Sequence, residues 1–291
     1  MAKKLFLISS VLCSLLPAAQ NDIYPTDYVA NKPGDIVTTL YLTEADTDEV
    51  FRHGSKILDE SSELSLQVLR LGYTTEFWGY TTTFTTVGLH AKTTMEGSVL
   101  ESLYPKSTSG YGDLRLGMTT WLINDPQNMR YFAITPMISL PVGTYDANRA
   151  FNIGENRYKA TLSLGYVDRF WDGKYGELFA ELSPEIAYFG DNDNAQGRTI
   201  EQKTAYALSG YLRYRPIPIT GIFAGYQINR GGETSINGLP QDDAPNNEHW
   251  MAGGALFAFG TQIILRYAQD RKTDNGFKTS NYTTLRLQWI F

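Results

Sequence analysis

The residues best suited to chemistry are three histidines, and their positions do not predict a catalytic site. His53, His90 and His249 are far apart in the chain. A barrel lipid hydrolase, the enzymatic alternative, needs a serine within hydrogen-bond reach of a histidine. The sequence has no Gly-x-Ser-x-Gly motif, phosphate-binding loop or dinucleotide fingerprint. With Cys13 as the only cysteine, metal-ligand spacing is also absent. We therefore expect no enzyme, cofactor or metal site.

Charged residues instead alternate with apolar ones, as on strands whose side chains point to opposite faces. In residues 157–171 the apolar face holds Tyr158 and Leu162, and the other face holds Lys159 and Ser163. A wet barrel lumen tolerates such charges, whereas an Arg or Lys facing lipid near the midplane costs about 2–4 kcal/mol. The same phasing predicts lumen-lining charges at Asp113, Arg115, Glu181, Glu185, Arg213, Arg266 and Arg286. They fit either a selectivity lining or a salt-bridge ladder that holds the wall.

The last ten residues give the clearest strand of this kind. Leu285, Leu287, Trp289 and the terminal Phe291 share one face, while Arg286 falls on the other. An ordinary strand of a soluble sheet is the alternative. An apolar face, a polar face and a terminal aromatic residue favour the final strand of a transmembrane barrel.

Twelve strand-like segments follow one another, and the connections between them alternate between short and long. Short periplasmic turns and long external loops are typical of outer-membrane barrels, and an even strand count puts both termini on the short-turn side. Aromatic residues gather near both ends of the segments, as in interfacial girdles. The segments cover residues 34–42, 63–77, 80–92, 110–123, 129–141, 157–171, 175–189, 203–215, 221–229, 249–259, 261–270 and 278–291.

The N-terminus predicts export. Lys3 and Lys4 precede an apolar run and then small residues, the pattern of a cleaved signal peptide over residues 1–19. We expect residues 20–33 to form an N-terminal periplasmic segment and residues 34–291 to form the barrel. Removing the two lysines makes the formal charge more negative than −6, so a nucleic-acid partner is not expected.

Twelve strands predict a narrow, partly occluded pore, because eight-stranded barrels are filled by side chains and sixteen-stranded ones are open. Two prolines interrupt predicted strands, Pro136 and Pro184. Proline cannot donate to the ladder and is normally found at edges or bulges. Each therefore indicates either a harmless bulge or a break in the wall. We predict that one break is a lateral opening through which an apolar solute reaches the bilayer.

Three short motifs resemble those of a known family. Gly110-Tyr-Gly-Asp-Leu-Arg-Leu-Gly117, Leu140-Pro-Val-Gly-Thr-Tyr-Asp146 and Asn152-Ile-Gly-Glu-Asn156 are similar to Gly-Asp-Leu and Pro-x-Gly-x-Tyr-Asp motifs of the family named for the meta pathway of phenol degradation. Val142 stands where that family more often has Thr. The resemblance covers about residues 34–291 and implies an outer-membrane barrel associated with uptake of small hydrophobic or aromatic compounds. It implies no catalytic residue.

The expected function is therefore passive uptake through an outer-membrane channel, and the alternative is a non-conducting structural or adhesin barrel. Expected partners are the lipid bilayer, lipopolysaccharide, a small-molecule permeant and the barrel-assembly machinery, which would read Phe291. Acidic residues gather in the predicted loops, for example Glu44, Asp46 and Asp48. They could bind calcium or bridged lipopolysaccharide, but a solvated loop is the preferred interpretation.

Overall fold

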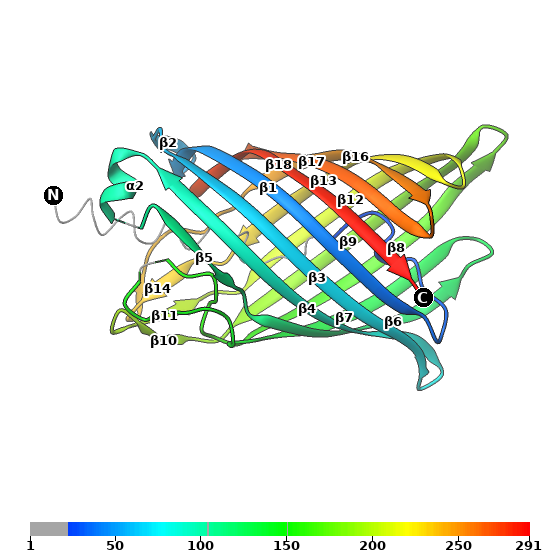
Figure 1. Ribbon diagram of the computed structural model, residues 1–291, viewed down its shortest axis with the longest axis horizontal. Coiled ribbons are helices and arrows are strands. Elements are labelled where there is room, and N and C mark those ends of the chain that lie inside the picture. Colours follow the sequence, from blue (N-terminus) through cyan, green and yellow to red (C-terminus); the bar gives the residue numbers. More distant parts are fainter. Residues whose placement is uncertain (1–22, 104, 150) are drawn as a thin grey trace.

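Twelve antiparallel strands close into a barrel in the computed structural model, which describes residues 23–103, 105–149 and 151–291 (Figure 1). Strand β18 pairs with β1 from Val37↔Ile290 to Phe51↔Gly276 and so closes the wall. The predicted all-β fold is confirmed, and the predicted signal peptide lies outside the described residues. The barrel strands are β1 (Ile36–Arg52), β3 (Ser61–Phe77), β4 (Tyr80–Glu96), β6 (Leu114–Asp125), β7 (Arg130–Leu140), β8 (Lys159–Gly173), β9 (Gly176–Phe189), β12 (Ala205–Ile217), β13 (Thr220–Gly231), β16 (Glu248–Ala258), β17 (Thr261–Lys272) and β18 (Gly276–Ile290).

The wall keeps the two-faced pattern of the sequence. On β3, Leu69, Leu71 and Tyr73 are exposed on the outer face, whereas Thr74 is buried inside. Because the side-chain period of a strand is two, a slip of one residue would turn the charges toward lipid. Within the described residues, no helix is long and apolar enough to cross a membrane.

Tight turns mark one rim of the barrel. Trp78-Gly79 joins β3 to β4 and Phe259-Gly260 joins β16 to β17, and all four residues have positive φ. Two consecutive positive φ angles are the geometry of the type I′ hairpin turn, which suits the twist of the strands. The C-terminus lies at this rim as well, because Phe291 and Ile36 exchange backbone hydrogen bonds of 2.9 and 3.0 Å (Figure 1).

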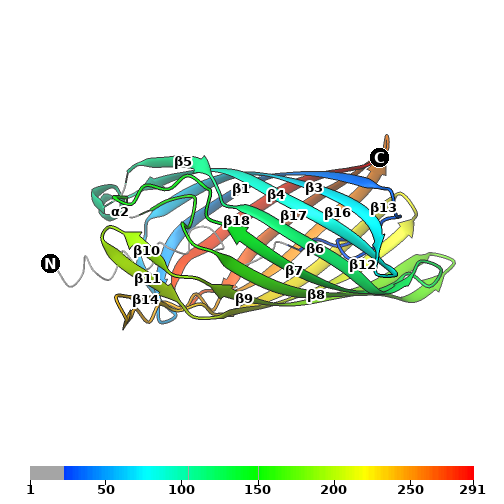
Figure 2. The same cartoon turned by 90° about the horizontal axis from the view of Figure 1, so that it is seen from below.

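The other rim carries the smaller elements, as Figure 2 shows at the end opposite the C-terminus. The connections after β9 and β13 pair with each other into a four-stranded sheet. The elements outside the twelve barrel strands are β2 (Ser55–Leu58), α2 (Ser98–Leu103), β5 (Ser107–Tyr111), β10 (Asn192–Ala195), β11 (Arg198–Gln202), β14 (Thr234–Ile236) and β15 (Leu239–Pro240).

Three predicted boundaries differ from the structure. The strand predicted at 34–42 runs on to Arg52, so Glu44, Asp46 and Asp48 lie on the exposed face of β1 and not in a loop. The connection predicted at 271–277 shrinks to residues 273–275, because β17 and β18 also extend. The strand predicted at 110–123 is divided at residues 112–113, where β5 ends and β6 begins. Polar residues in these extended strands suit pairing beyond the lipid, which a hydropathy pattern does not reveal.

Candidate functional site: the barrel lumen

The described part of the predicted periplasmic segment, from Ile23, crosses the lumen. We call residues 23–31 the N-terminal segment. Tyr211 of β12 donates from its hydroxyl to the Ile23 carbonyl at 2.8 Å, and Trp121 of β6 donates from Nε1 to the Tyr28 carbonyl at 2.8 Å. These strands lie in different parts of the wall, so the segment bridges the lumen between them. The described residues of the segment predicted at 20–33 therefore contact the barrel wall, and the periplasmic location of this segment stays a prediction.

Glycine in the wall makes room for this segment. The Tyr28 ring lies against Gly165 of β8, where any Cβ would overlap the ring. Tyr28 is 8% exposed and packs in a cluster with Trp121 and Val167. Gly165 is thus a contact surface for an aromatic ring as well as part of a strand.

A carboxylate holds the middle of the segment between two arginines. Asp27 Oδ1 lies 2.9 Å from Arg70 Nη2 and 2.9 Å from Arg286 Nη2. Burial alone would raise the pKa of Asp27, but the two guanidinium groups hold it below its ordinary value. Removing one partner from a buried ion pair typically costs about 3–5 kcal/mol, because the remaining charge stays uncompensated.

Further contacts bind both sides of the segment. The Thr26 backbone N–H donates to Glu181 Oε2 at 2.8 Å, and the other oxygen of Glu181 accepts from Arg213 Nε at 2.7 Å. The Arg266 guanidinium lies 3.9 Å above the Tyr24 ring, a cation–π contact inside the barrel. The wall thus presents matching charges and rings to a nine-residue segment.

The segment divides the lumen into two cavities. The larger has a volume of about 290 Å³ and lies toward the rim with the additional strands. The smaller, of about 60 Å³, is lined by Asp27, Arg286 and Gln288 nearer the C-terminal rim. Among the described residues, Arg70 is the one that lines both cavities. The N-terminal segment thus contributes side chains to both cavities, Tyr24 to the larger and Asp27 to the smaller.

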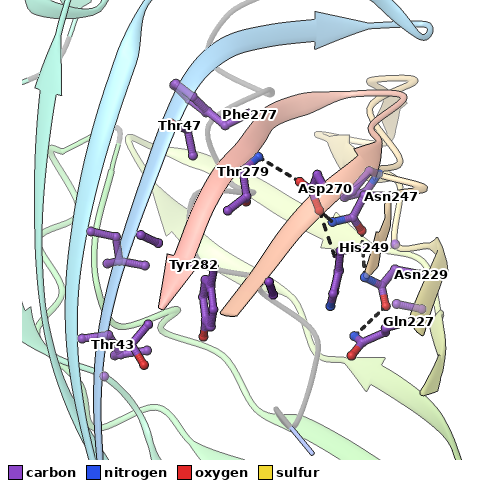
Figure 3. A pocket seen from close by; sticks show the side chains of 18 of the residues that line it. Thr43, Thr47, Gln227, Asn229, Asn247, His249, Asp270, Phe277, Thr279 and Tyr282 are labelled. Carbon is purple, nitrogen blue, oxygen red and sulfur yellow. Dashed lines mark hydrogen bonds and ion pairs between the residues drawn. The ribbon is translucent and has the colours of Figure 1, made fainter. Parts of the chain in front are cut away.

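The larger cavity has two unlike walls (Figure 3). Its apolar wall includes Ala45, Leu64, Leu89 and Phe277, which belong to one hydrophobic cluster inside the barrel. Its polar wall includes Gln227, Asn229, Asn247, His249 and Asp270 from the β13–β17 side. The volume of the larger cavity, about 290 Å³, is close to the lower end of the range for ligand pockets, which is about 300–1,000 Å³.

The β7–β8 loop forms part of the same cavity, and one carboxylate fixes it. Asp113 accepts from the backbone N–H of Gly143 and of Glu155, each at 2.9 Å. Burial raises the pKa of Asp113 above its ordinary value. The loop carries Ile153 and Phe151 into the apolar cluster. The three motifs that suggested a family from the sequence thus meet at Asp113.

The seven predicted lumen charges have different partners. Arg115 is half-buried beside the large cavity, and the other six are buried. Glu181, Arg213, Arg266 and Arg286 contact the N-terminal segment or support its partners, as described above. Glu185 accepts from Ser163 Oγ at 2.6 Å within the wall. Most of these charges therefore fix groups in place in this conformation.

Pro136 and Pro184 both lie on the exposed outer face. Beside Pro136 the β6–β7 pairing stops after Gly117↔Met137 and resumes at Thr120↔Ile134 in the same register, so there is no bulge. A hydroxyl contact bridges the gap, Thr119 Oγ1 to Thr135 Oγ1 at 2.9 Å.

Pro184 interrupts the β8–β9 pairing in the same way. The pairs Ser163↔Glu185 and Tyr166↔Leu182 keep one register, and Ser183 Oγ donates to the Leu164 carbonyl at 2.7 Å. The strand pairing is thus interrupted at both prolines while its register is kept, so neither proline lies in a bulge. A lateral opening at either position stays a prediction.

Sequence reasoning missed Asp27, Tyr24 and Tyr28, because it gave the segment before the first strand no role. The sequence does contain a signal for this role. Two aromatic residues and an acid stand close together just before a barrel whose predicted lumen charges include more arginines than carboxylates. His249, for which the sequence predicted no catalytic role, lines the cavity beside Asp270. In the described residues there is no group of three or more His, Cys, Asp or Glu able to hold a metal.

Comparison with known proteins agrees with this geometry. The family model described as "Putative MetA-pathway of phenol degradation" matches residues 48–287. The COG4313 outer membrane channel from Pseudomonas putida F1 is 25% identical, with a TM-score of 0.83 over 93% of this chain and 100% of that chain. The translocator domain of the autotransporter NalP from Neisseria meningitidis shares the fold, with 12% identity and a TM-score of 0.50 over 90% of each chain. No curated protein matches.

Proposed function

The chain belongs to the family described as putative MetA-pathway of phenol degradation, and from this premise we propose that it takes up small hydrophobic or aromatic molecules passively as an outer-membrane channel. The observation that carries the proposal is the large cavity, whose apolar wall lies inside a lipid-embedded barrel. A pore for sugars or salts would gain nothing from leucine and phenylalanine side chains in its lumen. The polar wall lets the same cavity stay hydrated when it is empty.

The closed state is part of the proposal. Because the N-terminal segment separates the two cavities, a solute passes only when this segment moves or when the solute leaves through the wall. Pro136 and Pro184 remain the proposed lateral opening. Tyr28 supports Pro184 as the site, because its ring covers Gly165, which lies beside the interrupted β8–β9 pairing.

The barrel lies in the outer membrane, and we extend the proposal to its orientation and partners. The rim with the tight turns and the C-terminus would face the periplasm, and Phe291, which is 74% exposed, would be available to the assembly machinery. The rim with the additional strands would then meet lipopolysaccharide.

Uptake into vesicles tests the function. The mature barrel is refolded into vesicles whose outer leaflet is lipopolysaccharide, which slows direct entry of apolar solutes, and entry of labelled toluene, benzoate and arabinose is timed. Faster entry of toluene than of arabinose, relative to vesicles without protein, supports the channel. A folded, heat-modifiable barrel that accelerates none of the three would instead support the structural or adhesin alternative.

A further inference from the structure

Five polar side chains form one hydrogen-bonded chain, and four of them, all but Ser209, line the polar wall of the large cavity (Figure 3). Ser209 Oγ donates to Gln227 Oε1 at 2.9 Å, and Gln227 Nε2 donates to Asn229 Oδ1 at 3.0 Å. Asn229 Nδ2 donates to Asn247 Oδ1 at 2.8 Å, and Asn247 Nδ2 donates to Asp270 Oδ1 at 3.4 Å. Every donor points the same way, so the chain is polarised and its acceptor end is the carboxylate.

Asp270 lines the cavity although it is only 5% exposed. Its other oxygen accepts from the Thr279 backbone N–H at 2.9 Å and from Thr273 Oγ1 at 3.4 Å, and His249 Nδ1 lies 3.7 Å from Oδ1. Within the described residues, no lysine or arginine lies within ion-pair distance of this carboxylate. This contrasts with Asp27 and Glu181, which are paired with arginines. A buried carboxylate without a permanent cation favours a ligand that brings a donor or a positive charge.

The rest of the cavity suits the other end of such a ligand. Leu64, Leu66 and Leu89 lie on β3 and β4, several strands around the wall from Asp270 on β17. Strand β18, which pairs with both β17 and β1, carries Phe277 of the apolar wall and also Tyr282 (Figure 3). A molecule with one polar end and one apolar end can therefore contact both walls at once.

We propose that the cavity binds an amphipathic solute whose hydrogen-bond donor, an ammonium or hydroxyl group, rests on Asp270 while its apolar body packs on the leucine wall. This inference rests on the proposed function and adds a preference for the head group. Asp270 is the specificity-determining residue, and the amide chain behind it fixes its orientation. A solute with a carboxylate head is disfavoured, because it would place a second negative charge beside Asp270.

Four probes with the same ring isolate the head group: benzylamine, benzyl alcohol, benzoate and toluene. Binding is measured by equilibrium dialysis at neutral pH against the mature barrel in lipid nanodiscs, with empty nanodiscs correcting for partition into lipid. Benzylamine and benzyl alcohol are expected to bind roughly tenfold more tightly than benzoate, the size of effect that one hydrogen bond to a charged group gives. Tighter binding of benzylamine than of benzyl alcohol identifies the ammonium as the better head group, and tighter binding of benzyl alcohol identifies the hydroxyl.

The Asp270→Asn variant should lose the preference for amine over benzoate, whereas Asp193→Asn, at an exposed position in β10, should keep it. Benzoate binding as tightly as benzylamine to the unmodified barrel would overturn the inference, and this comparison needs no variant. An unchanged preference for benzylamine over benzoate in a folded Asp270→Asn barrel would also overturn the inference. If toluene still enters vesicles but no head group is preferred, this inference fails while the channel stands.

Discussion

Single charged residues hold the N-terminal segment inside the barrel. The sequence pattern predicts that Arg286 faces the lumen, but it does not reveal that Arg286 shares a partner with Arg70. That partner is Asp27, which comes from outside the barrel wall. Alternation within strands identifies the face of a residue, whereas the contact with a separate segment depends on where that segment folds. The pattern therefore predicts a set of lumen charges, but not the role of any of them in holding the segment.

Replacing Asp27 with Ala should release the N-terminal segment. Arg70 and Arg286 would be left together without a carboxylate, a loss of about 3–5 kcal/mol for a buried pair. We expect a larger ion conductance in planar bilayers than for the unmodified barrel. Asp193→Asn serves as the control, and an unchanged conductance for Asp27→Ala would show that other contacts alone hold the segment.

Gly165 offers a steric test of the same contact. In Gly165→Ala the new methyl group would overlap the Tyr28 ring, whereas in Gly210→Ala its nearest neighbour, Leu182, is 3.7 Å away. We expect the first change to displace Tyr28 and raise conductance and the second to have little effect. Equal conductance in the two variants would argue that Tyr28 does not close the lumen.

The elements show where the sequence pattern is sufficient and where it is not. Turns such as Trp78-Gly79 could be placed, because a short polar or glycine-containing break between alternating segments has one simple interpretation. The β5–β6 break at residues 112–113 could not be placed, because Gly112 and Asp113 continue the alternation. Their role becomes visible only when the β7–β8 loop folds back onto Asp113.

The Asp113→Ala variant should loosen the β7–β8 loop. The backbone N–H groups of Gly143 and Glu155 would lose their acceptor, at about 1–3 kcal/mol for each buried group left unpaired. Arg149 is exposed in this loop and offers a trypsin site. We expect faster cleavage there, followed by mass spectrometry of the fragments, with Asp113→Asn intermediate because it keeps one carbonyl oxygen. Cleavage at the unmodified rate in both variants would contradict the role of Asp113.

At the scale of the whole molecule, the barrel is a shell around a cavity, and the N-terminal segment forms its floor. Strand number and the alternation of apolar and polar residues predict the shell, because a barrel in lipid needs apolar side chains outside and tolerates polar ones inside. The cavity depends on loops and on a segment that pack inside, and their positions are not encoded by any period in the sequence. This explains why the fold followed from the sequence while the floor of the site did not.

Filling the cavity tests most directly whether the solute passes through it. Ala268 is buried and lines the cavity, whereas Ala160 is exposed on the outer face of β8. Toluene entry into vesicles with a lipopolysaccharide outer leaflet is timed for the unmodified barrel, Ala268→Trp and Ala160→Trp. We predict that Ala268→Trp slows entry to the rate of vesicles without protein and that Ala160→Trp does not. Rapid entry through a folded Ala268→Trp barrel would contradict transport by way of this cavity.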